Sequence, residues 1–388
     1  MEHKLKFPKG FFWGAASASY QVEGGIYNTD WAYEAKTSKR VPVADSGPDH
    51  FNRFKEDFDI VKSLGHNSHR FSLEWARIEP EEGEFSIEAI RHYEHVFRAL
   101  KERNIEPFVT LWHFTIPEWL YKKGGVENKD FSKYFERYAK YVMENLSEHC
   151  SHWVTINEPI VFLSNGWSRG NWPPFKKGNI FKTIQVFNHL VDAHIRAYKT
   201  MKQIDIASEV GIVKDNIYFH SNWNPINKII AGVSRYFWNF TFLNNICNHV
   251  DTIGLNYYFH KKYGDNKQYK KNDMGWDIFP EGIYHTLMEL KRYNKPLFVS
   301  EAGIADANDI YRGQYIKDLV FWTHKAISDG ALIKGFMHWS LTDNFEWAKG
   351  YDHKFGLVEI DYNTKERKIR DSAFIYKEIC INNELTIN

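Results

Sequence analysis

Short apolar segments recur along the chain, and longer segments with a different pattern separate them. The apolar segments are seven to ten residues long and are rich in β-branched and aromatic side chains, as is typical of buried strands. There are eight such segments, at residues 11–19, 66–75, 106–113, 152–158, 209–216, 251–258, 296–303 and 333–341. Each of them predicts one β-strand.

The longer segments show helical spacing. In residues 131–146, apolar side chains recur every three or four positions and therefore share one face of a helix. Similar amphipathic segments cover approximately residues 50–64, 86–103, 181–204, 226–248, 281–293, 313–329 and 370–380. Eight alternations of strand and helix predict a parallel sheet with right-handed crossovers that closes on itself. The predicted fold is an α/β fold, a (β/α)8 TIM barrel. No linker or low-complexity tract divides residues 1–388, so we expect a single domain.

Polar and aromatic side chains gather at the ends of the predicted strands, which form the active-site face of such barrels. They are Gln21, Arg70, His113, Asn157, Glu158, Asn256, Tyr258, Glu301 and Trp339. The set combines hydrogen-bonding groups, carboxylates and aromatic rings, and it has no metal-ligand spacing. This combination suits a neutral, polyhydroxylated ligand, and we expect no cofactor.

Composition narrows the possible functions further. Lysine and arginine number 50 against 49 aspartate and glutamate residues, so no excess of positive charge indicates nucleic acid or an anionic membrane. Three cysteines lie far apart without zinc-ligand spacing, and no segment has the length of a membrane span. The N-terminal segment has a short apolar stretch broken by glycine, which indicates a first buried strand rather than a secretory signal. We therefore expect a cytoplasmic protein, and its oligomeric state stays open.

Two strand-end glutamates indicate the chemistry. Glu158 ends the run HWVTINE and Glu301 lies in PLFVSEAG, on the fourth and seventh predicted strands. An isolated glutamate at such a position often forms only a structural salt bridge. Two carboxylates that face one bond from different sides suit glycoside hydrolysis, because its oxocarbenium-like transition state needs a proton donor and a second carboxylate. Fourteen tryptophans are compatible with stacking on sugar rings, and equally with an aromatic-rich core.

Seven motifs in order along the chain resemble those of family 1 glycoside hydrolases, which are retaining β-glycosidases. They lie at residues 11–24, 70–80, 109–117, 155–159, 254–258, 299–303 and 339–361. The resemblance implies that Glu158, within TINEP, is the general acid/base and that Glu301, within VSEAG, is the nucleophile. It also implies that Arg70 keeps Glu301 charged and that Tyr258 hydrogen-bonds it, while burial and nearby negative charge keep Glu158 protonated.

The resemblance also implies the sugar contacts. The residues expected to bind the substrate are Gln21, His113, Asn157, Asn256, Trp339, Glu346 and Trp347. Asn157 is expected at the 2-hydroxyl and Trp339 beneath the sugar ring. Because Glu346 puts a carboxylate where phosphate-accepting members carry phosphate ligands, the expected substrate is an unphosphorylated β-D-glucoside or oligosaccharide, with galactosides and fucosides also accepted.

The chain departs from the family pattern at three places. Phe114 replaces a tryptophan, which removes an indole donor near the sugar, and Ala302 replaces a polar neighbour of the nucleophile. The loops between strands four and seven are short, which predicts an open entrance lined by Trp167, Trp172 and Trp223 or only surface packing of these rings. An inactive or weakly active sugar-binding protein and a transglycosidase remain alternatives to the hydrolase.

Overall fold

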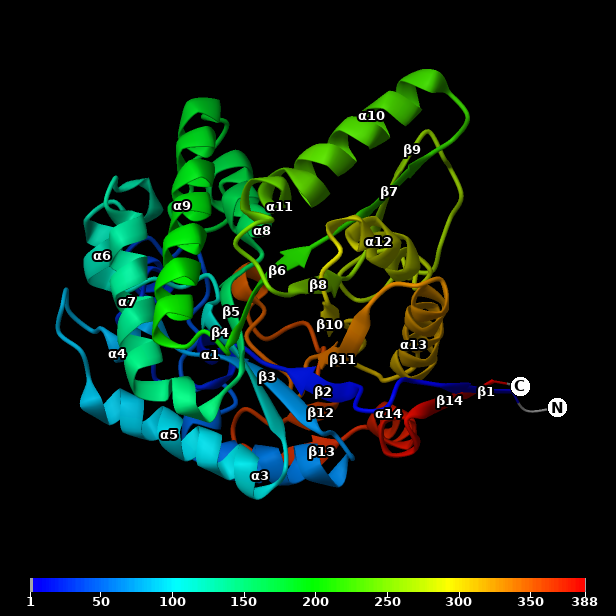
Figure 1. Cartoon of the computed structure of the whole chain (residues 1–388), viewed down its shortest axis with the longest axis horizontal. Coiled ribbons are helices and arrows are strands. Elements are labelled where there is room, and N and C mark those ends of the chain that lie inside the picture. The colour runs from blue at the N-terminus through cyan, green and yellow to red at the C-terminus, as the bar shows by residue number, and fades with distance from the viewer. Residues whose placement is uncertain (1–2, 388) are drawn as a thin grey trace.

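The computed structural model describes residues 3–387, and its centre is a closed barrel of eight parallel strands (Figure 1). The barrel strands follow one another around the ring in chain order, and the last pairs with the first. They are β2 (Phe12–Ala16), β3 (Ser68–Ser72), β4 (Glu106–Trp112), β5 (His152–Asn157), β6 (Glu209–Asp215), β8 (Ile253–Tyr257), β10 (Leu297–Ala302) and β11 (Ile333–Trp339). The predicted barrel is confirmed, and each of the eight predicted segments contains one barrel strand.

Helices that connect the barrel strands, with α14 after the last strand, cover the outside of the barrel (Figure 1). They are α3 (His50–Ser63), α5 (Ile87–Glu102), α7 (Phe131–Leu146), α9 (Ile180–Ile204), α10 (Pro225–Arg235), α11 (Thr241–Ile246), α12 (Gly282–Leu290), α13 (Arg312–Ser328) and α14 (Asp371–Asn382). The spacing that predicts α7 is confirmed by burial, because Phe131, Phe135 and Tyr138 are fully buried in the core. None of the helices within residues 3–387 is both long and apolar enough to cross a membrane.

Three small two-stranded sheets lie outside the barrel, and the sequence pattern does not predict them. They pair β1 (His3–Lys6) with β14 (Glu384–Ile387), β7 (Tyr218–Ser221) with β9 (His260–Tyr263), and β12 (Val358–Ile360) with β13 (Arg367–Ile369). Strands of three or four residues are too short to show a period of two. The first pair brings the two ends of the chain together, as Figure 1 shows.

Short helical segments complete the fold. The α-helical ones are α1 (Ser19–Val22), α2 (Asp30–Thr37), α4 (Trp75–Ile78), α6 (Glu118–Lys122) and α8 (Pro159–Leu163). Turns of 3-10 type span Gly125–Glu127, Ser147–His149, Lys291–Tyr293 and Trp347–Lys349, and turns of π type span Ser164–Arg169 and Tyr236–Phe240. The predicted strands 11–19 and 66–75 therefore end early, where the chain turns into α1 and α4. The predicted helix 226–248 is divided by the second π turn.

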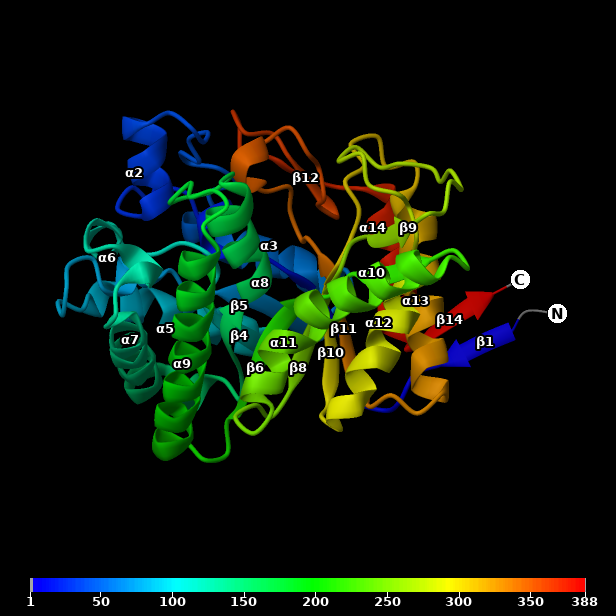
Figure 2. The same cartoon turned by 90° about the horizontal axis from the view of Figure 1, so that it is seen from above.

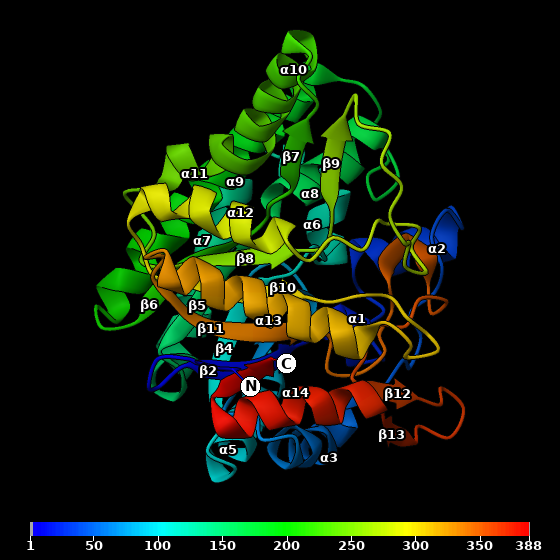
Figure 3. The same cartoon turned by 90° about the vertical axis from the view of Figure 1, so that its right-hand side faces the viewer.

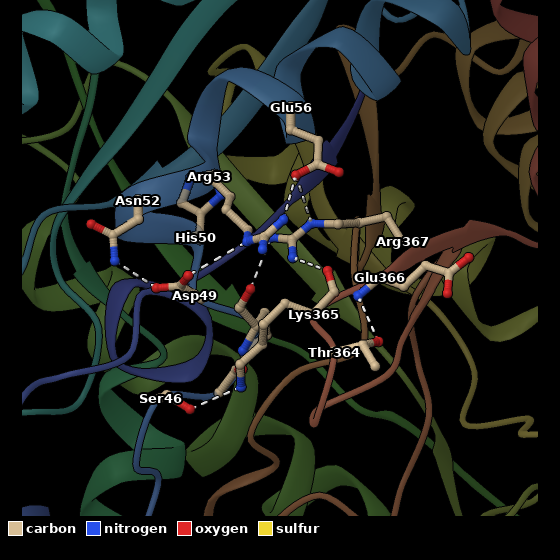
Figure 4. Close-up of polar contacts among 12 residues, drawn as sticks. Ser46, Asp49, His50, Asn52, Arg53, Glu56, Thr364, Lys365, Glu366 and Arg367 are labelled. Atoms are coloured by element: carbon tan, nitrogen blue, oxygen red, sulfur yellow. Dashed lines mark hydrogen bonds and ion pairs between the residues drawn. The ribbon is translucent and has the colours of Figure 1, made fainter.

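The β12–β13 hairpin is fastened to α3 and to the loop before it (Figure 4). Arg367 Nε donates to Asp57 Oδ1 at 2.9 Å and lies 3.9 Å from Glu56 Oε2. Lys365 Nζ donates to Ser46 Oγ at 2.8 Å. Figures 2 and 3 show this hairpin and α2 on the same side of the molecule. The contacts hold one end of the loop that leaves β11 and returns to β12, which supplies part of the active-site face.

A glycine brings the ends of β10 and β11 together. A Cβ atom on Gly303 would overlap the carbonyl oxygen of Trp339, so a larger residue would push the two strand ends apart. The close approach places the end of β10, with Glu301, beside the end of β11, with Trp339.

Candidate active site

A cavity of about 680 Å³ opens at the carboxyl ends of the barrel strands. Nine of the eleven predicted site residues line it: Gln21, His113, Asn157, Glu158, Tyr258, Glu301, Trp339, Glu346 and Trp347. The other two, Arg70 and Asn256, lie behind this wall and contact the residues that form it. The structure thus brings together side chains that are up to 326 positions apart in the sequence, from Gln21 to Trp347.

Glu301 is a buried carboxylate held by two donors. It belongs to β10 and is 3% exposed. Arg70, from β3, forms an ion pair with Glu301 Oε1, and the Tyr258 hydroxyl donates to Oε2 at 2.6 Å. Burial and the charge of Glu301 raise the pKa of Tyr258 well above its usual value, so the hydroxyl remains a donor. Both oxygens are therefore oriented, and the arginine stabilises the ionised form.

Glu158 lies near negative charges, in contrast to Glu301, which is paired with an arginine. It follows β5 in a left-handed backbone conformation, with φ 43° and ψ 59°, a strain of about 1–3 kcal/mol that is characteristic of functional sites. Asn256 Nδ2 donates to Glu158 Oε1 at 2.6 Å. Burial, followed by the negative charges of Asp215 and Glu301, raises the pKa of Glu158 well above its usual value. The site therefore contains one carboxylate paired with an arginine and one carboxyl group whose raised pKa favours the protonated form.

Arg70 and Asn256 connect these carboxylates from behind. Arg70 Nη2 donates to Asn157 Oδ1 at 2.7 Å while Nη1 contacts Glu301. Asn256 accepts a hydrogen bond from Ser300 Oγ at 2.8 Å, so both ends of its amide are occupied. The sequence predicts Asn256 as a substrate contact, whereas the structure places it as a support for Glu158.

Buried polar atoms without partners lie on the cavity wall. Neither His113 Nδ1 nor Gln21 Oε1 has a hydrogen-bond partner within the described residues. Asn157 Nδ2 lies 3.2 Å from His113 Nε2, and an amide nitrogen only donates, so Nε2 accepts and the ring proton lies on Nδ1. Burial and the charge of Arg70 lower the pKa of His113 well below its usual value, which keeps the ring neutral. Both atoms can form hydrogen bonds with a polar ligand in the cavity.

Aromatic rings and a further carboxyl group, that of Glu346, close the cavity on the side of the β11–β12 loop. Trp339 and Trp347 are 4% and 5% exposed, and each ring is nearly parallel to that of His113. Glu346 Oε2 accepts a hydrogen bond from Asn344 at 3.1 Å, and burial raises the pKa of Glu346 to about 7. A partly neutral carboxyl group both accepts and donates hydrogen bonds, which suits a hydroxyl ligand.

Further residues line the cavity although the sequence analysis does not select them, among them Asp215, Trp238 and Trp276. Asp215 is the last residue of β6, just as Glu158 is the first residue after β5. The pattern of an apolar strand followed by a carboxylate is therefore present for Asp215 too. Its pKa is raised to about 7 by burial, and its Oδ1 atom has no hydrogen-bond partner. Trp238 lies in the π turn Tyr236–Phe240 and Trp276 in the loop between β9 and α12.

Only some of the tryptophans predicted at the entrance line the cavity, and of the two departures from the family pattern only Phe114 does. Trp172 lines the cavity, but Trp167 is buried and donates to Glu127, and Trp223 is 89% exposed outside it. Phe114 lines the wall and packs against the rings of Trp172 and Trp347, at centroid distances of 5.0 and 5.1 Å. Ala302 is part of the buried core and does not line the cavity, so its effect on the cavity is indirect. No group of three or more potential metal ligands occurs in residues 3–387.

Comparison with known proteins identifies this arrangement. The model of glycosyl hydrolase family 1 matches residues 3–254 and 232–385, nearly the whole chain. The chain belongs to glycosyl hydrolase family 1. A 1,4-beta-D-glucan glucohydrolase from Thermotoga neapolitana is 33% identical over 442 positions, covering 98% of this chain and 99% of the relative. A beta-galactosidase from Sulfolobus acidocaldarius is 28% identical over 474 positions, covering 98% of this chain and 96% of the relative.

Solved structures of family 1 enzymes have the same fold. A beta-glycosidase from Pyrococcus horikoshii superposes with a TM-score of 0.93 at 34% identity, covering 99% of this chain and 96% of that chain. A beta-glucosidase from Thermotoga maritima in complex with glucoimidazole gives 0.92 at 32% identity, covering 97% and 99%. The alignment of 442 positions exceeds the 388 residues of the chain, so this family 1 member is shorter than its relative from T. neapolitana. The protein is a glycoside hydrolase.

Proposed function

We propose that this family 1 enzyme hydrolyses unphosphorylated β-D-glucosides, and also galactosides and fucosides, with retention of the anomeric configuration. The observation that carries the proposal is the contrast between the two glutamates. Glu301 is paired with Arg70 and Tyr258, whereas Glu158 has a strongly raised pKa from burial and from neighbouring negative charge. A retaining mechanism requires this division between nucleophile and acid.

In the first step, Glu301 attacks the anomeric carbon and Glu158 donates its proton to the departing glycosidic oxygen. The bond between the carbon and that oxygen breaks, and a glycosyl ester of Glu301 forms. Esterification removes the charge of Glu301, which is one of the causes of the raised pKa of Glu158. The ionised Glu158 then takes a proton from water, whose oxygen attacks the anomeric carbon and releases Glu301 unchanged.

The unpaired atoms of the wall supply the sugar contacts. We assign His113 Nδ1 as a donor to a ring hydroxyl and Gln21 Oε1 as an acceptor. Asn157 has one remaining amide proton, after its contact with His113, for the 2-hydroxyl. Glu346 and Trp347 are assigned to the remaining hydroxyls, and Trp339 to the face of the ring. A phosphate on this sugar would meet Glu346 and Glu301, which supports an unphosphorylated substrate.

The intact partners of both glutamates disfavour an inactive sugar-binding protein. A single catalytic domain is supported by the family match, which runs from residue 3 to 385. The cytoplasm is supported by three cysteines that form no disulfide, because unpaired thiols suit a reducing compartment.

The test is hydrolysis of a panel of 4-nitrophenyl glycosides that vary in sugar and anomer, with NMR identification of the first product. We expect turnover of β-D-glucoside and initial release of the β anomer. Glu301→Gln should lower kcat by on the order of a thousandfold or more. Glu102→Gln is the matched control, because Glu102 is 63% exposed at the opposite end of the barrel from the cavity. Release of the α anomer, or wild-type turnover by Glu301→Gln, would overturn the proposal.

A further inference from the structure

Three segments at the mouth of the cavity carry only positive charge. Residues 36–42, 165–178 and 347–350 contain no aspartate or glutamate, in a chain with nearly equal numbers of both signs. Their seven basic residues are Lys36, Lys39, Arg40, Arg169, Lys176, Lys177 and Lys349. We call these three segments the basic rim. Such a concentration of one charge in a balanced chain indicates a function for the charge.

The three segments are neighbours in space. The guanidinium carbon of Arg40 lies 3.8 Å from the centre of the Phe175 ring, which joins the first segment to the second. A Cβ atom at Gly350 would lie 3.5 Å from Pro42 Cγ, which joins the third segment to the first. Within the second segment, a Cβ atom at Gly170 would lie 3.3 Å from the carbonyl oxygen of Phe175. The basic rim is therefore one continuous side of the mouth.

Three of the cations reach the cavity itself. Arg40, Arg169 and Lys349 line it and are exposed, and within residues 3–387 none of their side chains forms a hydrogen bond or an ion pair. Arg169 is near enough to Asp215 for their charges to attract, but it forms no salt bridge with it. Arg40 is stacked on Phe175, and a stacked guanidinium keeps its in-plane N–H groups free for a carboxylate.

Charge is thus separated along the depth of one cavity. The carboxyl groups of Glu158, Asp215, Glu301 and Glu346 lie around the floor. Aromatic rings of intermediate exposure, among them Trp172 and Phe175, also line the cavity, whereas the cations at its mouth are exposed. A ligand that is neutral at one end, aromatic in the middle and anionic at the other end complements this order. The anion cannot sit on the sugar, because the sugar would lie among the carboxyl groups of the floor.

We infer that the basic rim is an aglycone subsite for an aromatic carboxylate, so that the preferred substrates are β-glycosides of hydroxylated aromatic acids. This inference rests on the proposed glycosidase function and specifies its substrate class. The aromatic wall contacts the ring of the aglycone, and the three cavity-lining cations contact its carboxylate. The same charge attracts the anionic substrate to the mouth from solution, with the sugar directed toward the floor.

The experiment compares 4-carboxyphenyl β-D-glucoside with its neutral carboxamide analogue, which has nearly the same size. The measured quantity is the ratio of kcat/KM for the acid to kcat/KM for the amide, in wild type and in variants. General damage to the site lowers both values and leaves the ratio unchanged. We expect Arg40→Gln, Arg169→Gln and Lys349→Gln each to lower the ratio about threefold, and the triple variant to lower it about tenfold or more. Lys101→Gln, an exposed lysine at the end of α5, is the matched control with an unchanged ratio.

Salt provides a second readout. Sodium chloride is raised about tenfold, from roughly 50 to roughly 500 mM. This should lower kcat/KM for the acid, because salt screens the attraction between its carboxylate and the exposed cations, and it should leave kcat/KM for the amide nearly constant. A ratio that stays within about twofold of wild type in the triple variant would overturn the aglycone subsite while leaving the glycosidase function intact. If neither substrate is hydrolysed, the proposed function fails. The aglycone subsite is then tested by calorimetric measurement of the affinity of the wild-type protein for each compound, and equal affinities would overturn the subsite.

Discussion

Replacing Asp215 with asparagine should move the basic limb of the pH profile toward lower pH. Glu158 must be protonated to release the aglycone, so activity is lost as the pH rises through its pKa. The negative charge of Asp215 is the second cause of that raised pKa, after burial. Asparagine keeps the shape of the side chain and removes the charge. The pKa of Glu158 should fall, and activity should therefore be lost at a lower pH.

The size of the shift follows from Coulomb's law. Asn157 pairs with Val213, so Asp215 lies two residues further along the neighbouring strand, and diagonal side chains of this kind are roughly 7 Å apart. We use this value for the carboxyl groups of Asp215 and Glu158. At an effective dielectric constant of about 20, two unit charges at that distance interact by roughly 2.4 kcal/mol, or about 1.7 pKa units. Asp215 itself has a pKa of about 7, and Lys214, whose pKa burial lowers to about 8, offsets part of its charge. We expect a net shift of about one pH unit.

The assay is kcat/KM for 4-nitrophenyl β-D-glucoside across the pH range in which the protein stays folded, because this parameter reports the free enzyme. Asp59→Asn is the matched control, since it removes one carboxylate that is 68% exposed on α3. Its basic limb should coincide with that of wild type. A basic limb that does not move in Asp215→Asn, or that moves to higher pH, would refute the coupling between Asp215 and Glu158.

Two other substitutions test single contacts. Tyr258→Phe removes the 2.6 Å hydrogen bond to Glu301, and we expect kcat to fall about 10- to 100-fold, measured with the same substrate, with stability unchanged by thermal denaturation. A fall smaller than twofold would contradict an orienting role (threshold of about 0.4 kcal/mol). Arg370→Met leaves buried Asp343 without its bidentate partner and should lower the free energy of unfolding by about 3–5 kcal/mol in urea titrations. Arg103→Met, whose partner Asp59 is 68% exposed, should lower it by about 1 kcal/mol or less. Equal losses for the two would show that burial of the pair is irrelevant.

The barrel and the catalytic pair were predictable because both have local signatures. An apolar segment followed by a polar side chain marks a strand that ends at the active-site face, as for Glu158 after β5. The partners of Glu301 were predicted as well: Tyr258 directly follows β8, and Arg70 lies within β3. Asp215 has the same signature at the end of β6, so a local signal for it is present in the sequence as well.

Other features have no local signature. The mouth of the cavity is built from the loop after β5 and from turns after α2 and β11, whose mutual positions depend on packing over long distances. Trp167 and Trp172 differ by five positions, yet one is buried against Glu127 and the other lines the cavity. Tryptophan content alone does not distinguish these outcomes. The direction in which a loop side chain points requires the structure.

Chemistry and selectivity are carried by different parts of this protein. The catalytic pair is held by partners from β3, β5, β8 and β10, and most atoms of these partners are already engaged, as both ends of the Asn256 amide show. Substitutions there disturb several contacts at once. The cavity-lining cations of the basic rim make no hydrogen bond or ion pair with the rest of residues 3–387, so their charge changes without disturbing the pair. A short member of the family that keeps its carboxylates and varies its mouth therefore retains one reaction while its aglycone changes.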